Sequence, residues 1–83
     1  MSTIIKIEGL RVVIYTNDHR PAHVHVIGSD CEAVFDLHCP EGPPELRENY
    51  RFSIREVSRI KANLTDVLKK LCQSWSKTHG NYK

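Results

Sequence analysis

The feature that most constrains the fold is one long amphipathic stretch in the last third of the chain. It begins at Ser53-Ile54-Arg55-Glu56, which matches a capping box with Ser53 as the N-cap and Glu56 reaching back to it. Gly80 is placed to end the helix. We therefore expect one helix from Ile54 to His79, about 39 Å long. Its apolar face recurs at steps of three and four and comprises Ile54, Val57, Ile60, Leu64, Val67, Leu68, Leu71 and Trp75.

The segments before this helix show the period-two pattern of β-strands. Residues 10–15 are the clearest strand, with Leu10, Val12 and Ile14 on one face. Residues 3–8 form a shorter strand that Gly9 ends, and residues 45–52 either return to the sheet as an edge strand or stay extended. The 83 residues hold one domain, 1–83. The expected fold class is α+β, a small antiparallel sheet of three to five strands with one long C-terminal helix packed across one face.

Residues 23–27 and 31–38, separated by a Gly-Ser-Asp turn, are typical of a β-hairpin. An even pairing register would set imidazoles opposite core residues. An odd register, made by a two-residue turn or a four-residue loop, instead pairs Val24 and Val26 with the apolar Ala33 and Phe35. The hydrophobic pattern favours the odd register, which gathers the polar side chains on the opposite face: His23, His25, Glu32 and Asp36.

The charges divide unevenly along the chain. Residues 1–52 hold five Lys or Arg against eight Asp or Glu, a net of −3, and residues 53–83 hold seven against two, a net of +5. An acidic sheet half joined to a basic helix half can meet a partner of either sign, although solvation is the commoner reason for such charges.

The cysteines and the N-terminus bear on the compartment. Cys31, Cys39 and Cys72 are odd in number and contain no CxxC pair, so they do not describe a disulfide framework, which fits a reducing cytosol. The N-terminus lacks a signal-peptide pattern, and no apolar run approaches the length of a membrane span. We expect a cytoplasmic protein without a membrane partner.

The chemistry is concentrated in one stretch, Asp18-His19-Arg20-Pro21-Ala22-His23-Val24-His25-Val26. On a strand, His23 and His25 share a face. Asp18 and His19 enter from a turn in which Pro21 fixes the backbone. Such a cluster suits a metal or general acid–base chemistry, because imidazoles titrate near neutral pH and also ligate divalent ions. The alternative is a polar sheet face on which the imidazoles bond each other, Tyr15 or the backbone.

A metal would need a third ligand, because two imidazoles alone rarely hold zinc. The available ligands are Asp18, His19, Glu32 and Asp36, and the cluster contains no cysteine. We expect no metal and no other cofactor, and a direct hydrogen bond between one of the histidines and Asp36 or Glu32.

Three weaker candidates lie elsewhere. His38 and Cys39, joined by Cys31, could complete a zinc site, but the spacing matches no zinc finger and inert thiols are commoner. The basic outer face of the helix is a candidate contact for a phosphate backbone, although an ordinary solvated face is commoner: Arg55, Arg59, Lys70 and Lys77. The spacing of a third group along the helix favours core and cap residues over a functional site: Cys72, Trp75 and His79.

Residues 18–26 resemble the DHxPPHxHV signature of the bacterial family known as domain of unknown function 4160. The resemblance covers nearly the whole chain. Residues 10–17 look like the strand that enters the motif, residues 28–36 like the strand after it, and residues 71–75 with 79–80 like the helix end of one subgroup. Ala22 departs from the pattern, because the family often has a second proline there. This loosens the turn but removes no chemical group.

The resemblance implies a small prokaryotic or phage-borne protein, often encoded beside another small protein and suspected to be the toxin half of a toxin–antitoxin pair. We therefore expect an effector that acts through the His/Asp cluster, with RNA as a candidate target and a small antitoxin-like protein as partner. The expected catalytic residues are His23, His25, Asp18, His19 and Arg20, the last as phosphate clamp. The alternative is a non-catalytic module that binds a protein or a structural metal. The sequence decides neither whether the chain is an enzyme nor what its oligomeric state is.

Overall fold

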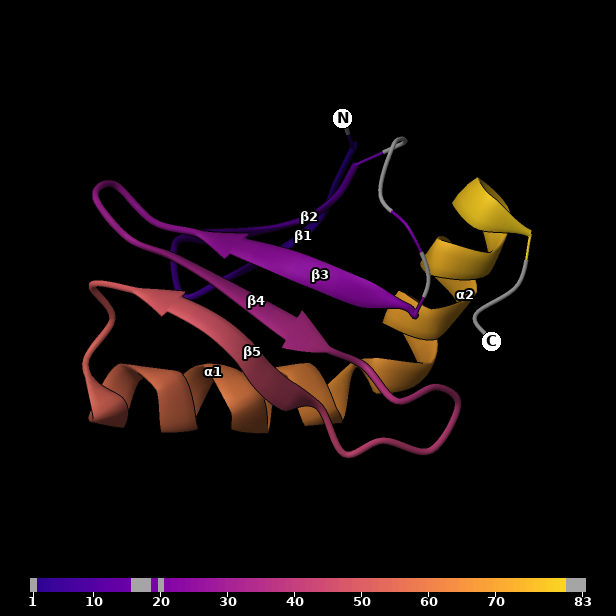
Figure 1. Cartoon of the computed structure of the whole chain (residues 1–83). Helices are drawn as coiled ribbons and strands as arrows, with labels where there is room; N and C mark the ends of the chain where they lie inside the picture. Colours follow the sequence, from indigo (N-terminus) through magenta and orange to yellow (C-terminus); the bar gives the residue numbers. More distant parts are fainter. Residues whose placement is uncertain (1, 16–18, 20, 81–83) are drawn as a thin grey trace.

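The computed structural model describes residues 2–15, 19 and 21–80. Five strands form one antiparallel sheet in sequence order, and two helices follow it (Figure 1). The strands are β1 (Ser2–Ile7), β2 (Leu10–Ile14), β3 (His23–Ile27), β4 (Glu32–Asp36) and β5 (Glu45–Tyr50). The helices are α1 (Ile54–Asp66) and α2 (Leu68–His79). The α+β class and the antiparallel sheet are therefore confirmed.

The core lies between one face of the sheet and the two helices. The alternating apolar residues of the strands face it, as their period of two requires. The predicted inner face of β2 is confirmed, with Val12 and Ile14 buried and Leu10 packed against them. The buried residues of the sheet and the helices form one cluster, which includes Phe35, Leu37, Leu64, Leu71 and Trp75.

The hairpin of β3 and β4 has the odd register. Val24 pairs with Phe35 and Val26 with Ala33, so the valines and their partners share the core. Ile27 pairs with Glu32, which leaves a four-residue loop of residues 28–31. The N–H of Gly28 donates to the carbonyl of Cys31 at 2.8 Å within this loop. The hydrophobic pattern was enough to choose the register, because a shift of one residue would turn the valines out of the core.

The expected single helix is wrong, because the chain forms two. The capping box is present as predicted: Ser53 Oγ accepts from the N–H of Glu56, and the Glu56 carboxylate accepts from the N–H of Ser53. At Val67, however, the backbone leaves the helical region, with φ −117° and ψ 18°. In Figure 1, α2 turns away from the direction of α1.

The break at Val67 has a reason in the size of the sheet. A straight helix of about 39 Å is longer than the molecule, whose greatest extent is 33 Å. Its last turns would project past the sheet with their apolar side chains exposed. Val67 follows Thr65 and Asp66, and all three have a lower helix propensity than the leucine and lysines that come next, so this stretch of α-helix is the least costly to interrupt. One apolar position is also lost, since Ile54 is 87% exposed.

The expectation that the cysteines form no disulfide is wrong as well. Cys39 and Cys72 are joined, with their Cα atoms 5.8 Å apart, and Cys31 is the free thiol. Spacing could not reveal the bond, because the pair lies 33 residues apart in the sequence. The bond forms because the loop after β4 returns against α2. It also removes the cysteine-based argument for a reducing cytosol. In the described part of the chain, no helix has both the length and the apolar character to cross a membrane.

Candidate functional site

Strand β3 brings two of the three histidines of the motif together. Because Val24 and Val26 face the core, His23 and His25 fall on the other face of the sheet. Their ring centroids lie 5.3 Å apart in an edge-on arrangement. His23 is buried, at 5% exposed, whereas the side chain of His25 is 16% exposed. His25 is thus the more accessible of the two.

The partners of His25 come from the strands on either side. Glu32 at the start of β4 accepts a hydrogen bond from Nδ1 of His25, at 3.3 Å between Nδ1 and Oε2. The ring of Tyr15, just after β2, meets the imidazole edge-on with the centroids 4.7 Å apart. The expected carboxylate–histidine hydrogen bond is therefore confirmed for Glu32. Asp36 does not make one, because it pairs with Arg47 of β5 instead.

His23 is held by the backbone before it and by a helix. Its Nδ1 donates to the carbonyl oxygen of Pro21 at 2.9 Å. Its ring lies 5.2 Å, centroid to centroid, from the indole of the fully buried Trp75 in α2. A neutral imidazole carries one N–H, so a donating Nδ1 leaves the basic lone pair on Nε2. The same holds for His25, whose Nδ1 is turned to Glu32. In the neutral form of either ring, Nε2 is therefore the nitrogen that carries no hydrogen.

Helix α2 completes the cluster. One turn after Trp75, the ring of His79 packs on the indole with a centroid distance of 4.1 Å. The Nε2 of His79 donates to the carbonyl oxygen of Tyr15 at 3.2 Å, which returns the contacts to the end of β2. We call the group formed by these residues the aromatic cluster: Tyr15, His23, His25, Trp75 and His79.

Sequence reasoning missed the helical half of this cluster. The sequence pattern predicts Trp75 and His79 as core and cap residues, and Trp75 is indeed buried. Their separation of four residues placed them on one side of a helix. Nothing in the pattern showed that α2 would turn toward the start of β3, so the contact between Trp75 and His23 was not predictable.

The remaining predicted site residues are not part of the aromatic cluster as described. His19 is exposed and makes none of the described contacts of the cluster. Asp18 and Arg20 lie outside the described residues, so their expected roles stay predictions. Among the residues that the structure describes, no group of three or more His, Cys, Asp or Glu is arranged to hold a metal.

The zinc site considered at His38 and Cys39 is ruled out by the disulfide, because a bonded Cys39 has no thiolate to offer. Cys31 lies in the loop between β3 and β4, where its thiol donates to the carbonyl of Arg51 at 3.8 Å. His38 instead pairs with Glu45, with 3.0 Å between Nε2 and Oε1, on an exposed surface. This second histidine–carboxylate pair provides a useful control for the pair in the cluster.

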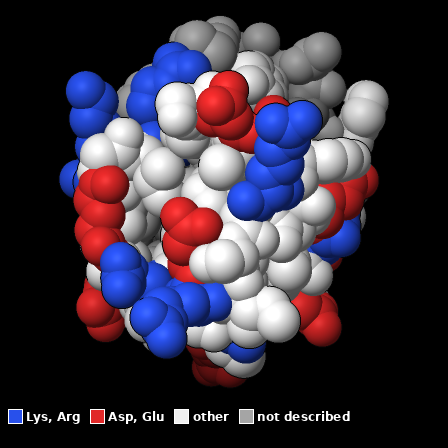
Figure 2. All heavy atoms as spheres, turned by 90° about the vertical axis from the view of Figure 1, so that its left-hand side faces the viewer, with Lys and Arg blue, Asp and Glu red and all other residues white. Residues whose placement is uncertain are grey.

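Charges on the described surface are mixed rather than gathered. The end of the molecule that carries the β3–β4 turn shows Lys and Arg interspersed with Asp and Glu (Figure 2). Arg59, on the predicted basic helix face, pairs with Glu8 at 3.5 Å. A phosphate backbone would therefore find no continuous basic surface on the end that carries the β3–β4 turn.

Tyr50 lies opposite Glu32 in the sheet and donates a hydrogen bond to Glu48 at 3.1 Å. This hydrogen bond raises the pKa of Tyr50.

Comparison with known proteins places this site in a family. The family model described as Domain of unknown function (DUF4160) matches residues 9–76. The matched span contains β2 to β5, both strand histidines, the two disulfide cysteines and Trp75, and it stops short of His79. Neither a curated protein nor a solved structure matches the chain.

Proposed function

The chain belongs to the family described as Domain of unknown function (DUF4160), and from that premise we propose that it is a small effector that cleaves RNA by general acid–base catalysis at His25. One observation carries the proposal. His25 is a partly exposed imidazole whose Nδ1 is held by Glu32 at 3.3 Å, beside a second imidazole 5.3 Å away. A carboxylate that orients an imidazole and selects its tautomer is a recurring feature of catalytic bases.

In this proposal His25 Nε2 takes the proton of a ribose 2′-hydroxyl. The oxygen then attacks the adjacent phosphorus and the bond to the 5′-oxygen breaks. The imidazolium returns its proton to that leaving oxygen, so the products are a 2′,3′-cyclic phosphate and a 5′-hydroxyl. The reaction needs no metal and no redox partner. We assign His23 a positioning role, because it is more deeply buried and its ring packs edge-on against His25.

Cations near the phosphate would stabilise the charge that develops in the transition state. Among the described residues, Arg11 is a candidate for this cation. It is exposed and pairs with Ile27 across β2 and β3, which sets it on the same sheet face as His25. Arg20, two residues before Ala22 in the motif, is the cation proposed from the sequence.

The test is induced expression in a bacterial host, followed by incubation of the purified protein with a labelled single-stranded RNA. We expect growth arrest and RNA cleavage, both lost in His25→Ala while far-UV circular dichroism stays unchanged. His38→Ala is the matched control, because it removes a histidine that also pairs with a glutamate but lies outside the aromatic cluster. Cleavage that persists in His25→Ala would contradict the proposal.

A second candidate is a non-catalytic module that binds a small antitoxin-like protein. The exposure of β5 favours it, because every residue from Glu45 to Tyr50 is exposed and β5 ends the strand order of the sheet. Such an edge can accept a strand from a partner. Absence of growth arrest, together with binding of one partner per chain that survives His25→Ala, would favour this module over the enzyme.

A further inference from the structure

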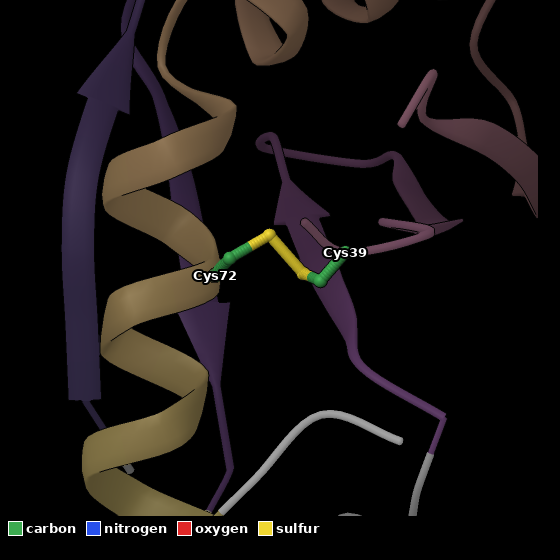
Figure 3. The surroundings of a disulfide bond; sticks show 2 residues. All are labelled: Cys39 and Cys72. Carbon is green, nitrogen blue, oxygen red and sulfur yellow. A yellow bond between two sulfur atoms is a disulfide. The ribbon is translucent and has the colours of Figure 1, made fainter. Parts of the chain in front are cut away.

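The disulfide lies next to the aromatic cluster rather than in a remote part of the fold. Figure 3 shows the side chains of Cys39 and Cys72 reaching toward each other between the segment after β4 and helix α2. Cys72 precedes Trp75 by three residues, about one helical turn, so both side chains leave α2 on neighbouring positions of one side. The bond therefore anchors the part of α2 that presents Trp75 to His23.

The other end of the bond is anchored to the strand that carries the histidines. Two residues before Cys39, the N–H of Leu37 donates to the carbonyl of Ala22 at 3.0 Å. Ala22 directly precedes His23, and Leu37 is fully buried. The disulfide links α2 to the segment after β4, and the hydrogen bond links that segment to the start of β3. Together they connect the two elements that carry Trp75 and His23.

From this arrangement we propose that the Cys39–Cys72 bond is a redox switch that holds the aromatic cluster together. In the oxidised protein, α2 is tied down and Trp75 is packed on His23. In the reduced protein, the end of α2 moves away from the start of β3 and the cluster loosens. The consequence for RNA cleavage rests on the proposed function; the change in the packing of Trp75 does not.

Apart from the bond, α2 is held to the core by three buried apolar side chains, Leu68, Leu71 and Trp75. Its N-cap, Val67, makes no side-chain hydrogen bond to the helix. Val67 also ends α1, so the helical backbone is interrupted there. At the far end of α2, His79 contacts Trp75 and donates a hydrogen bond to the Tyr15 carbonyl.

The chemistry of the switch is thiol–disulfide exchange with a dithiol reductant. Cys39 is partly exposed, whereas Cys72 is 4% exposed. The thiolate of the reductant therefore attacks the sulfur of Cys39, and Cys72 leaves as a thiolate. The second thiol of the reductant then releases Cys39. The protein gains two electrons and two protons, and the dithiol becomes a cyclic disulfide. Cys31 contacts the carbonyl of Arg51 instead and takes no part.

Trp75 is the only tryptophan of the chain, so its fluorescence reports the contact directly. With dithiothreitol as the reductant, we expect emission at longer wavelength and a rise of about twofold in quenching by acrylamide, because the indole leaves a fully buried position. Far-UV circular dichroism should stay near its oxidised value. Thiol titration of the denatured protein should find one free thiol before reduction and three after it.

Two variants control the experiment. The double variant Cys39→Ser/Cys72→Ser should show the reduced spectrum without dithiothreitol and should not respond to it. Cys31→Ser should behave like the native protein in both states. Unchanged tryptophan emission after complete reduction would overturn the switch, and so would loss of the whole far-UV signal, because that is global unfolding rather than a local release.

RNA cleavage, measured in the same samples, separates this proposal from the proposed function. A tryptophan response without cleavage in either redox state rejects the enzyme and leaves the switch standing. Cleavage that is equal in both states rejects the switch as a control of the site and leaves the enzyme standing.

Discussion

The ring centroids of Trp75 and His23 lie 5.2 Å apart, and both side chains are buried although they are far apart in the sequence. This contact connects the C-terminal helix to the strand that carries the histidine motif. A helix that was identified from the sequence as a core element is therefore also part of the candidate site.

Replacement of Trp75 should be costly for stability. We expect Trp75→Ala to lower the free energy of unfolding by about 3–5 kcal/mol, because it removes a fully buried aromatic ring and leaves a cavity. His79→Ala should cost about 1 kcal/mol, the usual value for one hydrogen bond. Urea unfolding followed by far-UV circular dichroism measures both. The control is Ile54→Ala, since Ile54 is 87% exposed; a similar cost at Ile54 would contradict the assignment of Trp75 to the core.

The glutamate beside His25 should matter for activity more than for stability. Glu32→Gln keeps an acceptor oxygen but removes the charge, and we expect RNA cleavage to fall about tenfold. The free energy of unfolding should change by less than about 1 kcal/mol, because Glu32 is 43% exposed and the pair is screened by solvent. Glu45→Gln changes the other histidine–carboxylate pair and should leave cleavage unchanged. Equal losses of cleavage in the two variants would refute the assignment.

The disulfide should contribute strongly to stability. It closes a loop of 33 residues, and loss of that closure corresponds to about 3–4 kcal/mol in the chain-entropy description. We expect Cys39→Ser/Cys72→Ser to lower the free energy of unfolding by this amount in urea. Cys31→Ser should change it by less than about 0.5 kcal/mol, because the free thiol makes one weak hydrogen bond at an exposed site. A larger loss of unfolding free energy in Cys31→Ser than in Cys39→Ser/Cys72→Ser would mean that the bond does not form.

The capping box should appear in the pH dependence of stability. The hydrogen bond from the backbone N–H of Ser53 lowers the pKa of Glu56 below its ordinary value of 4.5. A carboxyl whose pKa is lower in the folded state stabilises the fold above its unfolded pKa, and this contribution is lost as the pH falls through the folded value. Glu56→Gln keeps an acceptor that does not titrate. We therefore expect this variant to lose less stability than the native protein between neutral pH and a pH well below 4.5, measured by urea unfolding. An identical loss in both proteins would speak against the cap.

Local patterns predicted those features that neighbouring residues control. The capping box at Ser53 and Glu56, the end of the helix at Gly80 and the register of the hairpin were all confirmed. Each depends on a hydrogen bond within a few residues or on a period of two, and neither needs knowledge of the rest of the fold. The hydrogen bond between His25 and Glu32 followed from the same register.

The break at Val67 and the disulfide depended on distances that local patterns do not contain. The apolar stripe continues through Val67 without interruption, and only the 33 Å extent of the molecule shows why one straight helix does not fit. The pairing of Cys39 with Cys72 required the loop after β4 to meet α2.

The sequence by itself thus determined the class of fold, the antiparallel hairpin and the placement of two imidazoles on one sheet face. These follow from side-chain periodicity, which is a property of the chain and not of its surroundings. Only the tertiary structure decided that Trp75 and His79 would join those imidazoles and that Cys39 and Cys72 would be bonded. The physical reason is that the direction of α2 is set by how the helices cover a short sheet, and that direction emerges only when all the apolar faces are packed together.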